Sequence, residues 1–331
     1  MSMRAHAIRA VPVLAFAAAL AAWGAPGRAA ADTADDYPSR PITFINTSAA
    51  GSSLDLMMRT LGKFMSPLLK QNIIVEDRPG GTGAVGMALA LNKPADGYTI
   101  VSATSSTSFL MADPHARYKP DDFVFLRALQ AEPSVVAVNK DSPYKTLPQL
   151  VNALKNTPDK VTVGGYAAAG FHQFVFFRLQ QVARFHATWV PYQGGNEAAL
   201  ALMGQHIDAV LMTPSTALSQ IKSGQFRLLG ISTEKRDPSF PAVPTFKEQG
   251  YDVVELIWRG VMVKRGTPAP IIDRLSAALD KVEADPEWKV FMDANYQMPM
   301  QLTQTQMQQK VQREVADERV FLKSLGVTQA Q

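Results

Sequence analysis

The sequence has no cysteine in 331 residues and only five histidines. The missing thiols exclude disulfides, cysteine nucleophiles, thiolate metal sites and the lipid-modified cysteine of exported lipoproteins. No two histidines stand at HExxH or another paired ligand spacing, so we predict no metal site and treat each as a surface or packing residue. The five are His6, His115, His172, His186 and His206.

Long apolar runs are also missing, apart from one near the N-terminus. Thirteen largely apolar residues, 11–23, follow Arg4 and Arg9 and precede three alanines at 29–31. A membrane span needs about 20 apolar residues, whereas a basic start, a short apolar stretch and small residues are typical of a secretory signal peptide. We therefore predict a signal peptide at residues 1–31, of the Sec type because paired arginines are absent, and a soluble mature protein in a bacterial periplasm.

Neither sign of charge dominates the mature chain. The formal net charge is +4, but Arg4, Arg9 and Arg28 belong to the predicted signal peptide, and the remainder is nearly neutral. Its basic residues, such as Lys222 and Arg227, are scattered rather than arranged in a stripe with aromatic residues. We therefore expect no nucleic-acid partner.

Short β-branched runs alternate with amphipathic segments along the chain. Strands are expected at residues 41–46, 72–76, 98–103, 134–139, 161–166, 207–212 and 226–232, and helices at 54–68, 197–203, 216–223 and 268–284. The alternation predicts an α/β protein with mostly parallel sheets covered by helices, and the length predicts two domains. In such sheets ligands bind at the carboxyl ends of strands, where helix N-termini present N–H groups.

The stretch EDRPGGTGAVG, residues 76–86, places Gly81, Gly83 and Gly86 at the GxGxxG spacing. A dinucleotide-binding loop would belong to the first βα unit and would be followed about 20 residues later by an acid. Here the motif follows the second expected strand, and Ser106 stands at the acidic position. We therefore interpret the glycines as a tight turn with close helix packing and predict no nucleotide cofactor.

Other catalytic patterns are absent. The sequence has no GxSxG elbow and no GxxxxGK[ST] phosphate loop, and its serines and carboxylates stand at no catalytic spacing. We predict no catalytic residues and expect a protein that is not an enzyme. The expectation rests on missing motifs, so a periplasmic enzyme stays as an alternative.

Eight segments, spread over the mature chain in a fixed order, together resemble one family. They are residues 37–45, 49–55, 76–86, 93–100, 190–209, 221–232, 243–251 and 258–275. The mature chain is similar to the Bug family of periplasmic solute-binding proteins, the receptors of tripartite tricarboxylate transporters. The 76–86 segment resembles a framework turn of that family, which agrees with the structural interpretation of its glycines.

The resemblance implies a two-domain periplasmic binding protein of type II-like topology, with a ligand cleft between domains that two crossing strands join. The crossings are expected within residues 123–139 and near 253–261. The first domain would comprise residues 32–132 plus 260–331, and the second residues 133–259. The implied partners are a small-molecule carboxylate and the membrane permease subunits of a transporter, and we expect a monomer without cofactors.

The family also implies that loop amides and small hydroxyls hold the carboxylate. By correspondence with its loops, the expected ligand-binding residues are Ser48, Ala49, Ser52, Ser53, Ser105, Ser106, Thr107, Ala168, Ala169, Phe171, His172, Tyr192, Thr213, Ser215 and Arg259. For the hydroxyls, the alternative is ordinary helix capping. His172 is either a packing residue or a ligand contact.

Departures from the family pattern bear on specificity. Met212 stands where amino-acid-binding members carry an Asp, which disfavours an amino-acid ligand. Phe171, Tyr192 and Trp258 would suit a less hydrophilic carboxylate unless they are packing residues, the favoured interpretation for Trp258. Arg259 either binds a second carboxylate bidentately or anchors the hinge through an internal acid. The function expected is capture of a di-, tri- or aromatic carboxylate by hinge closure and its delivery to a transporter, or its presentation to a periplasmic sensor.

Overall fold

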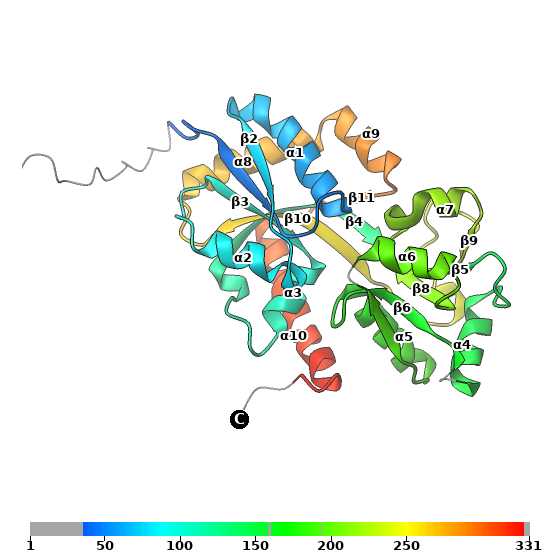
Figure 1. The fold of residues 1–331 in the computed structure, drawn as a ribbon. Coiled ribbons are helices and arrows are strands. Elements are labelled where there is room, and N and C mark those ends of the chain that lie inside the picture. Colours follow the sequence, from blue (N-terminus) through cyan, green and yellow to red (C-terminus); the bar gives the residue numbers. More distant parts are fainter. Residues whose placement is uncertain (1–35, 158–159, 193, 328–331) are drawn as a thin grey trace, which may run out of the picture.

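The computed structural model describes residues 36–157, 160–192 and 194–327, so the predicted signal peptide lies outside the described residues. Two β-sheets, each covered by helices, form two lobes that lie side by side (Figure 1). The first lobe contains a sheet of order β11-β4-β10-β3-β1-β2, and the second a sheet of order β7-β6-β8-β5-β9. The α/β fold class with two lobes is therefore confirmed.

The first lobe is built from both ends of the described chain. Its strands are β1 (Ile42–Asn46), β2 (Ile73–Asp77), β3 (Thr99–Thr104), β4 (Phe123–Pro133), β10 (Leu256–Lys264) and β11 (Met298–Pro299). Its helices are α1 (Ser53–Leu69), α2 (Ala84–Leu91), α3 (Ser105–Ala112), α8 (Ala269–Glu283), α9 (Pro286–Ala294) and α10 (Gln304–Ser324), with short 3-10 turns η1 (Gly81–Gly83) and η2 (Pro120–Asp122).

The second lobe uses the middle of the chain. Its strands are β5 (Val135–Asn139), β6 (Val163–Tyr166), β7 (Trp189–Tyr192), β8 (Ala209–Met212) and β9 (Phe226–Ile231). Its helices are α4 (Leu147–Asn156), α5 (Phe171–Ala183), α6 (Gly195–Met203) and α7 (Leu218–Lys222), with the 3-10 turns η4 (Pro214–Ala217) and η5 (Lys247–Gln249).

The sheets are mixed rather than mostly parallel, which corrects the expectation from sequence. Strand β1 pairs in parallel with β2 and β3, and β6 pairs in parallel with β7 and β8. Strand β10 is antiparallel to both β3 and β4, and β5 is antiparallel to β8 and β9. These antiparallel pairs involve the strands at the two passages between lobes. The chain leaves the first lobe on β4 and returns to it beside β4, on β10, so the two strands run in opposite directions.

The two passages between the lobes lie against each other. Strand β4 ends at Pro133 and β5 begins at Val135, so only Ser134 separates the two sheets. The return passage runs from β9 to β10, and its Ser232 donates its N–H to the Ser134 carbonyl at 2.9 Å while its Oγ accepts from the Ser134 N–H at 2.8 Å. The domain limits drawn at residues 132 and 259 stay predictions.

Helix α1 shows how local sequence fixes the first lobe. Ser52 caps its N-terminus by accepting from the Asp55 N–H. Residues at helical spacing, Met57, Leu61 and Met65, are buried against the sheet. Each buried side chain of this size contributes about 1.5–3 kcal/mol relative to exposure, so the helix and the loop before it are held firmly.

Gly260 lies where β10 packs most tightly against β4. A Cβ at this position would lie 2.0 Å from the Arg127 carbonyl oxygen and 2.8 Å from the Ala128 Cα. Backbone atoms cannot rotate away as side chains can, so the strands would have to separate. We predict that Gly260→Ala lowers the free energy of unfolding by about 2–3 kcal/mol, measured by urea titration. Gly194→Ala, at a position with no neighbouring atom within 4 Å, is the control, and equal losses in both variants would contradict the prediction.

Helix α10 carries a buried carboxyl group. Glu318 is 3% exposed, and its Oε1 accepts from Ser108 Oγ of α3 at 2.9 Å. Burial, and then the nearby Glu314, raise the pKa of Glu318 to about 9. The folded protein therefore holds a proton on Glu318 at neutral pH that the unfolded chain releases.

This proton makes stability depend on pH. The stabilisation from protonated Glu318 is complete below pH 4.5 and is lost as pH rises through about 9. We predict that Glu318→Gln gains on the order of 5 kcal/mol over the wild type between pH 5 and pH 9, measured by urea unfolding at both values. Glu287→Gln removes an exposed carboxyl of α9 and controls for net charge; a constant difference between Glu318→Gln and the wild type at both pH values would count against the assignment.

Candidate functional site

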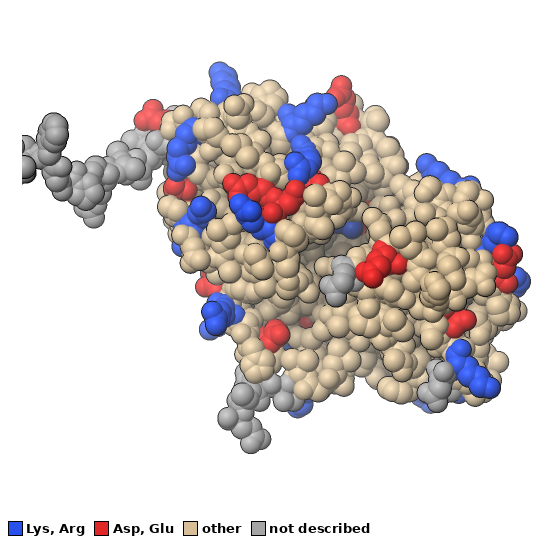
Figure 2. Space-filling view, in the orientation of Figure 1, with Lys and Arg blue, Asp and Glu red and all other residues tan. Residues whose placement is uncertain are grey.

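A cavity of about 920 Å³ lies between the two lobes. Its walls come from the loops after β1, β2 and β3 in the first lobe and from those after β6, β7 and β8 in the second. Figure 2 shows this face hollowed between the lobes, with most of its surface formed by uncharged residues. The cavity thus lies at the carboxyl ends of strands, where the sheet architecture predicts a ligand.

Several helices begin at the wall of this cavity. Lining residues include the first residues of α1 and α3 from the first lobe and of α5 and α6 from the second, together with the turn η1 that leads into α2. Helix N-termini present unpaired N–H groups and the positive end of the helix dipole. An anion held between the lobes would therefore be stabilised from both sides without a cationic side chain.

Thirteen of the fifteen residues predicted from sequence line the cavity: Ser48, Ala49, Ser52, Ser53, Ser106, Thr107, Ala168, Phe171, His172, Tyr192, Thr213, Ser215 and Arg259. The other two do not. Ser105 is 2% exposed and its Oγ accepts from the Trp258 N–H at 3.1 Å, so it joins α3 to β10. Ala169 packs against the apolar core and donates its N–H to Gln173 Oε1 at 2.6 Å. Ligand contact by the thirteen stays a prediction.

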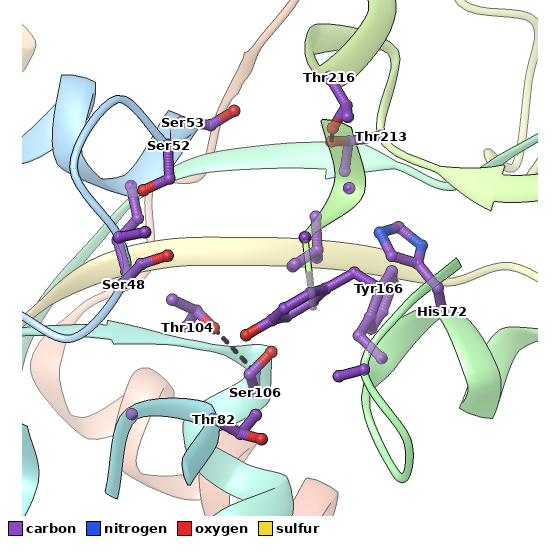
Figure 3. A pocket seen from close by; sticks show the side chains of 18 of the residues that line it. Ser48, Ser52, Ser53, Thr82, Thr104, Ser106, Tyr166, His172, Thr213 and Thr216 are labelled. Carbon is purple, nitrogen blue, oxygen red and sulfur yellow. Dashed lines mark hydrogen bonds between the residues drawn. The ribbon is translucent and has the colours of Figure 1, made fainter. Parts of the chain in front are cut away.

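Many of the predicted hydroxyls are already bonded within the fold. Ser52 accepts from the Asp55 N–H, Thr107 accepts from the Thr104 N–H, and Ser53 Oγ lies 3.1 Å from Ser215 Oγ of the other lobe. The hydroxyls of five cavity residues, by contrast, bond to no other described group: Ser48, Thr82, Ser106, Tyr166 and Tyr192. In Figure 3 the Tyr166 side chain extends across the cavity, with its hydroxyl directed toward Ser106. These five are the hydroxyls best placed to bind a ligand.

Arg259 lies at the base of the cavity in a buried ion pair. Its Nη1 donates to Glu132 Oε1 at 2.9 Å, and the two residues are 5% and 0% exposed. Glu132 also accepts from Gln297 Nε2 at 3.0 Å and from Ser215 Oγ at 2.7 Å. The alternative in which an internal acid anchors Arg259 is therefore the one that the structure shows, while the guanidinium still lines the cavity.

His172 and Trp258 are both buried close to Arg259. The His172 ring is buried, and its Nδ1 lies 3.1 Å from Ser134 Oγ at the passage between lobes. Burial, and then the Arg259 charge, lower the pKa of His172 to about 3, so the ring is neutral. Trp258 is fully buried and donates its ring N–H to Glu314 of α10, so it does not line the cavity.

A family model described as the tripartite tricarboxylate transporter family receptor (TctC) matches residues 57–327. The chain belongs to this family. BugT of Bordetella pertussis is 32% identical over 261 residues, which cover 77% of this chain and 80% of BugT. Among solved structures, a TctC solute-binding protein from Polaromonas is 26% identical with a TM-score of 0.71 over 87% of this chain and 99% of that chain. The periplasmic binding protein BugD is 25% identical with a TM-score of 0.77 over 89% of this chain and 100% of BugD.

The resemblance to Bug proteins seen in the sequence is thus confirmed. The two solved relatives named above are described as a solute-binding protein and a periplasmic binding protein. In the described part of the chain, no three His, Asp or Glu side chains gather as a metal site. Every described helix is also too short or too polar to cross a membrane.

The glycine motif of this receptor has both structural and cleft roles. A Cβ at Gly86 would lie 3.0 Å from the Thr47 side chain and 3.2 Å from the Arg78 carbonyl oxygen, so close packing of α2 requires glycine there. Residues 79–83 of the same motif line the cavity. Thr82 has a left-handed backbone with φ 57°, a conformation that costs a non-glycine residue energy and often marks a functional site.

Four further residues that line the cavity were not among the ligand-binding residues predicted from sequence: Tyr166, Asn196, Thr216 and Ile257. Tyr166 is the last residue of the expected strand 161–166, and its place at a strand's carboxyl end was the available signal. No sequence motif marked Asn196, Thr216 or Ile257 as a binding residue. Ile257 lies in the returning strand β10, and Thr216 Oγ1 lies 3.0 Å from Thr213 Oγ1. Their position depends on how the lobes meet.

Ser215 links both lobes to the buried ion pair, since it bonds to Ser53 and donates to Glu132. Removal of the Ser215 hydroxyl would leave the buried Oε2 of Glu132 without its hydrogen-bond donor. We predict that Ser215→Ala lowers the free energy of unfolding by about 1–3 kcal/mol, measured by thermal and urea unfolding of the unliganded receptor. Ser219→Ala, at an exposed position of the neighbouring helix α7, should be neutral. If both variants unfold alike, the Ser215 link is energetically unimportant.

Proposed function

We propose that this chain is an exported periplasmic receptor that captures an organic carboxylate by closing its lobes and delivers it to a tripartite tricarboxylate transporter. The observation that carries the proposal is the cavity itself. Helix N-termini from both lobes border it, and no acidic side chain is among the described residues that line it. An environment of N–H groups and free hydroxyls favours an anion over a neutral or cationic solute.

The position of the cavity supports closure as the binding step. The lobes are connected by two adjacent passages at Ser134 and Ser232, and few covalent connections allow rotation of one lobe against the other. A ligand that contacts both walls binds the closed arrangement better than the open one and shifts the population toward it. In this role the receptor acts as a monomer, presents the closed form to the permease subunits and requires no cofactor.

The ligand is not an amino acid in this proposal. A bound α-ammonium group needs a carboxylate close by, and Met212 occupies the place of the Asp that amino-acid-binding members use. No Asp or Glu is among the described lining residues, and Glu132 beneath them is already engaged with Arg259. A buried ammonium without a counter-charge would cost several kcal/mol.

Thermal unfolding of the purified chain against a panel of carboxylates and amino acids tests this function. At 100 times its dissociation constant, a bound carboxylate should raise the free energy of unfolding by about 2.7 kcal/mol, and amino acids should leave the melting temperature unchanged. Chromatography of the carboxylate after incubation should recover it intact, whereas turnover would indicate an enzyme.

A matched pair of variants ties the effect to the cavity. Ala168 is exposed and lines the cavity wall, so Ala168→Trp should occupy the binding space and abolish the ligand-induced shift. Ala242→Trp adds the same side chain at an exposed position away from the cavity and should retain the shift. No shift with any carboxylate, in protein that mass spectrometry shows to be free of copurified ligand, would refute the proposed function.

A further inference from the structure

The cavity between the lobes has few charged side chains. Arg259 is the only charged side chain among the described residues that line it, and His172 beside it is neutral. Arg259 is not free to act as a cation, because Glu132 forms a buried ion pair with it. The side chains at the base of the cavity therefore contribute no net charge.

Several hydrogen bonds fix the position of the Glu132 carboxylate. Three donors from three separate segments hold its carboxylate: Arg259 of β10, Gln297 before β11 and Ser215 of η4. Glu132 itself is fully buried on β4. A ligand carboxylate that displaced Glu132 from Arg259 would leave one buried carboxylate without its ionic partner, which is a large energetic cost.

The two walls of the cavity differ in chemistry. The wall of the first lobe carries hydroxyls and helix starts, including Ser48, Thr82 and Ser106. The opposite wall also carries helix starts and polar side chains, but it holds the aromatic side chains of the lining and two of its larger apolar ones: Tyr166, Phe171, Tyr192, Leu211 and Met212. Helix starts and hydroxyls suit a carboxylate, and the aromatic and apolar side chains of the second lobe suit a part of the ligand that carries no charge.

We propose that the cavity selects a carboxylate with a single anionic group and an uncharged, largely apolar remainder, and that Glu132 sets this selectivity by neutralising Arg259. The inference rests on the proposed function and narrows its ligand class. A second carboxylate on the ligand would have to be buried against the apolar side chains of the second lobe or beside the ion pair of Arg259 and Glu132, which has no net charge. Burial of an unpaired charge is unfavourable in either place.

The decisive experiment compares ligands that differ by one carboxylate. Hexanoate with adipate, and 4-methylbenzoate with terephthalate, keep the skeleton and exchange a methyl group for a carboxylate. Calorimetric titration of the wild-type chain should give at least about tenfold tighter binding of the monocarboxylate in at least one pair.

Two variants test the role of Glu132. Glu132→Gln leaves Arg259 without its carboxylate, so the ratio of dicarboxylate to monocarboxylate affinity should rise at least about tenfold. The double variant Glu132→Gln with Arg259→Gln removes both charges and should return the ratio to the wild-type value. Glu318→Gln, which removes a buried carboxyl outside the cavity lining, should leave the ratio unchanged.

Each outcome bears on a different claim. Equal or tighter binding of the dicarboxylates by the wild type would overturn this inference and leave the receptor function intact. Binding of neither member of either pair, together with no response to the wider carboxylate panel, would overturn the receptor function. Selectivity for monocarboxylates that persists in Glu132→Gln would remove Glu132 as its cause. If that variant does not fold, the wild-type comparison still decides the ligand class.

Discussion

The buried carboxylate of Glu132 is the interaction on which the arrangement of this receptor depends most. It lies near the end of β4, just before the first passage between lobes. It bonds to the returning strand through Arg259, to the second lobe through Ser215 and to the segment before β11 through Gln297. A buried ion pair contributes little net stability compared with an apolar replacement, but removal of one partner is costly. Its effect here is to fix the geometry of the junction and to define the charge of the cavity above it.

The two lobes supply different parts of a binding site, and neither is sufficient alone. At the cavity, Ser215 of the second lobe bonds to two residues of the first: its Oγ lies 3.1 Å from Ser53 Oγ and donates to Glu132 Oε2 at 2.7 Å. A hydrogen bond between two hydroxyls is worth about 0.5–1.5 kcal/mol. Away from the cavity, Phe321 of α10 packs on Phe174 and Phe177 of α5, with ring centroids 5.5 and 5.1 Å apart. The apolar contact can hold the lobes together while the cavity side is closed by whatever the two walls bind.

The sequence predicted the architecture well because its signals are local. Strand β1, helix α1 with its Ser52 cap and helix α8 follow from periodicity and capping. Thirteen of the predicted site residues line the cavity, and most of them lie in loops or at helix starts that follow strands. The mixed direction of the strands could not be predicted from local sequence, because it depends on the pairing of β10 with β3 and β4, which lie far away along the chain. Ser105 lies outside the cavity lining for a related reason: its hydroxyl accepts from the Trp258 N–H, 153 residues away.

The case of Arg259 shows most clearly what a sequence cannot provide. An arginine near a cleft has two opposite meanings, a free cation for a second carboxylate or one half of an internal pair, and only the partner decides between them. That partner, Glu132, lies 127 residues earlier in a strand with otherwise apolar neighbours, where no motif marks it. With Glu132 paired to Arg259, the cavity changes from a site for multiple charges to one whose attraction for anions comes from helix N-termini and unpaired hydroxyls. The helix dipoles are spread over both walls and are weaker than a full charge, so they favour one carboxylate and leave further affinity to be supplied by the apolar side chains of the second lobe.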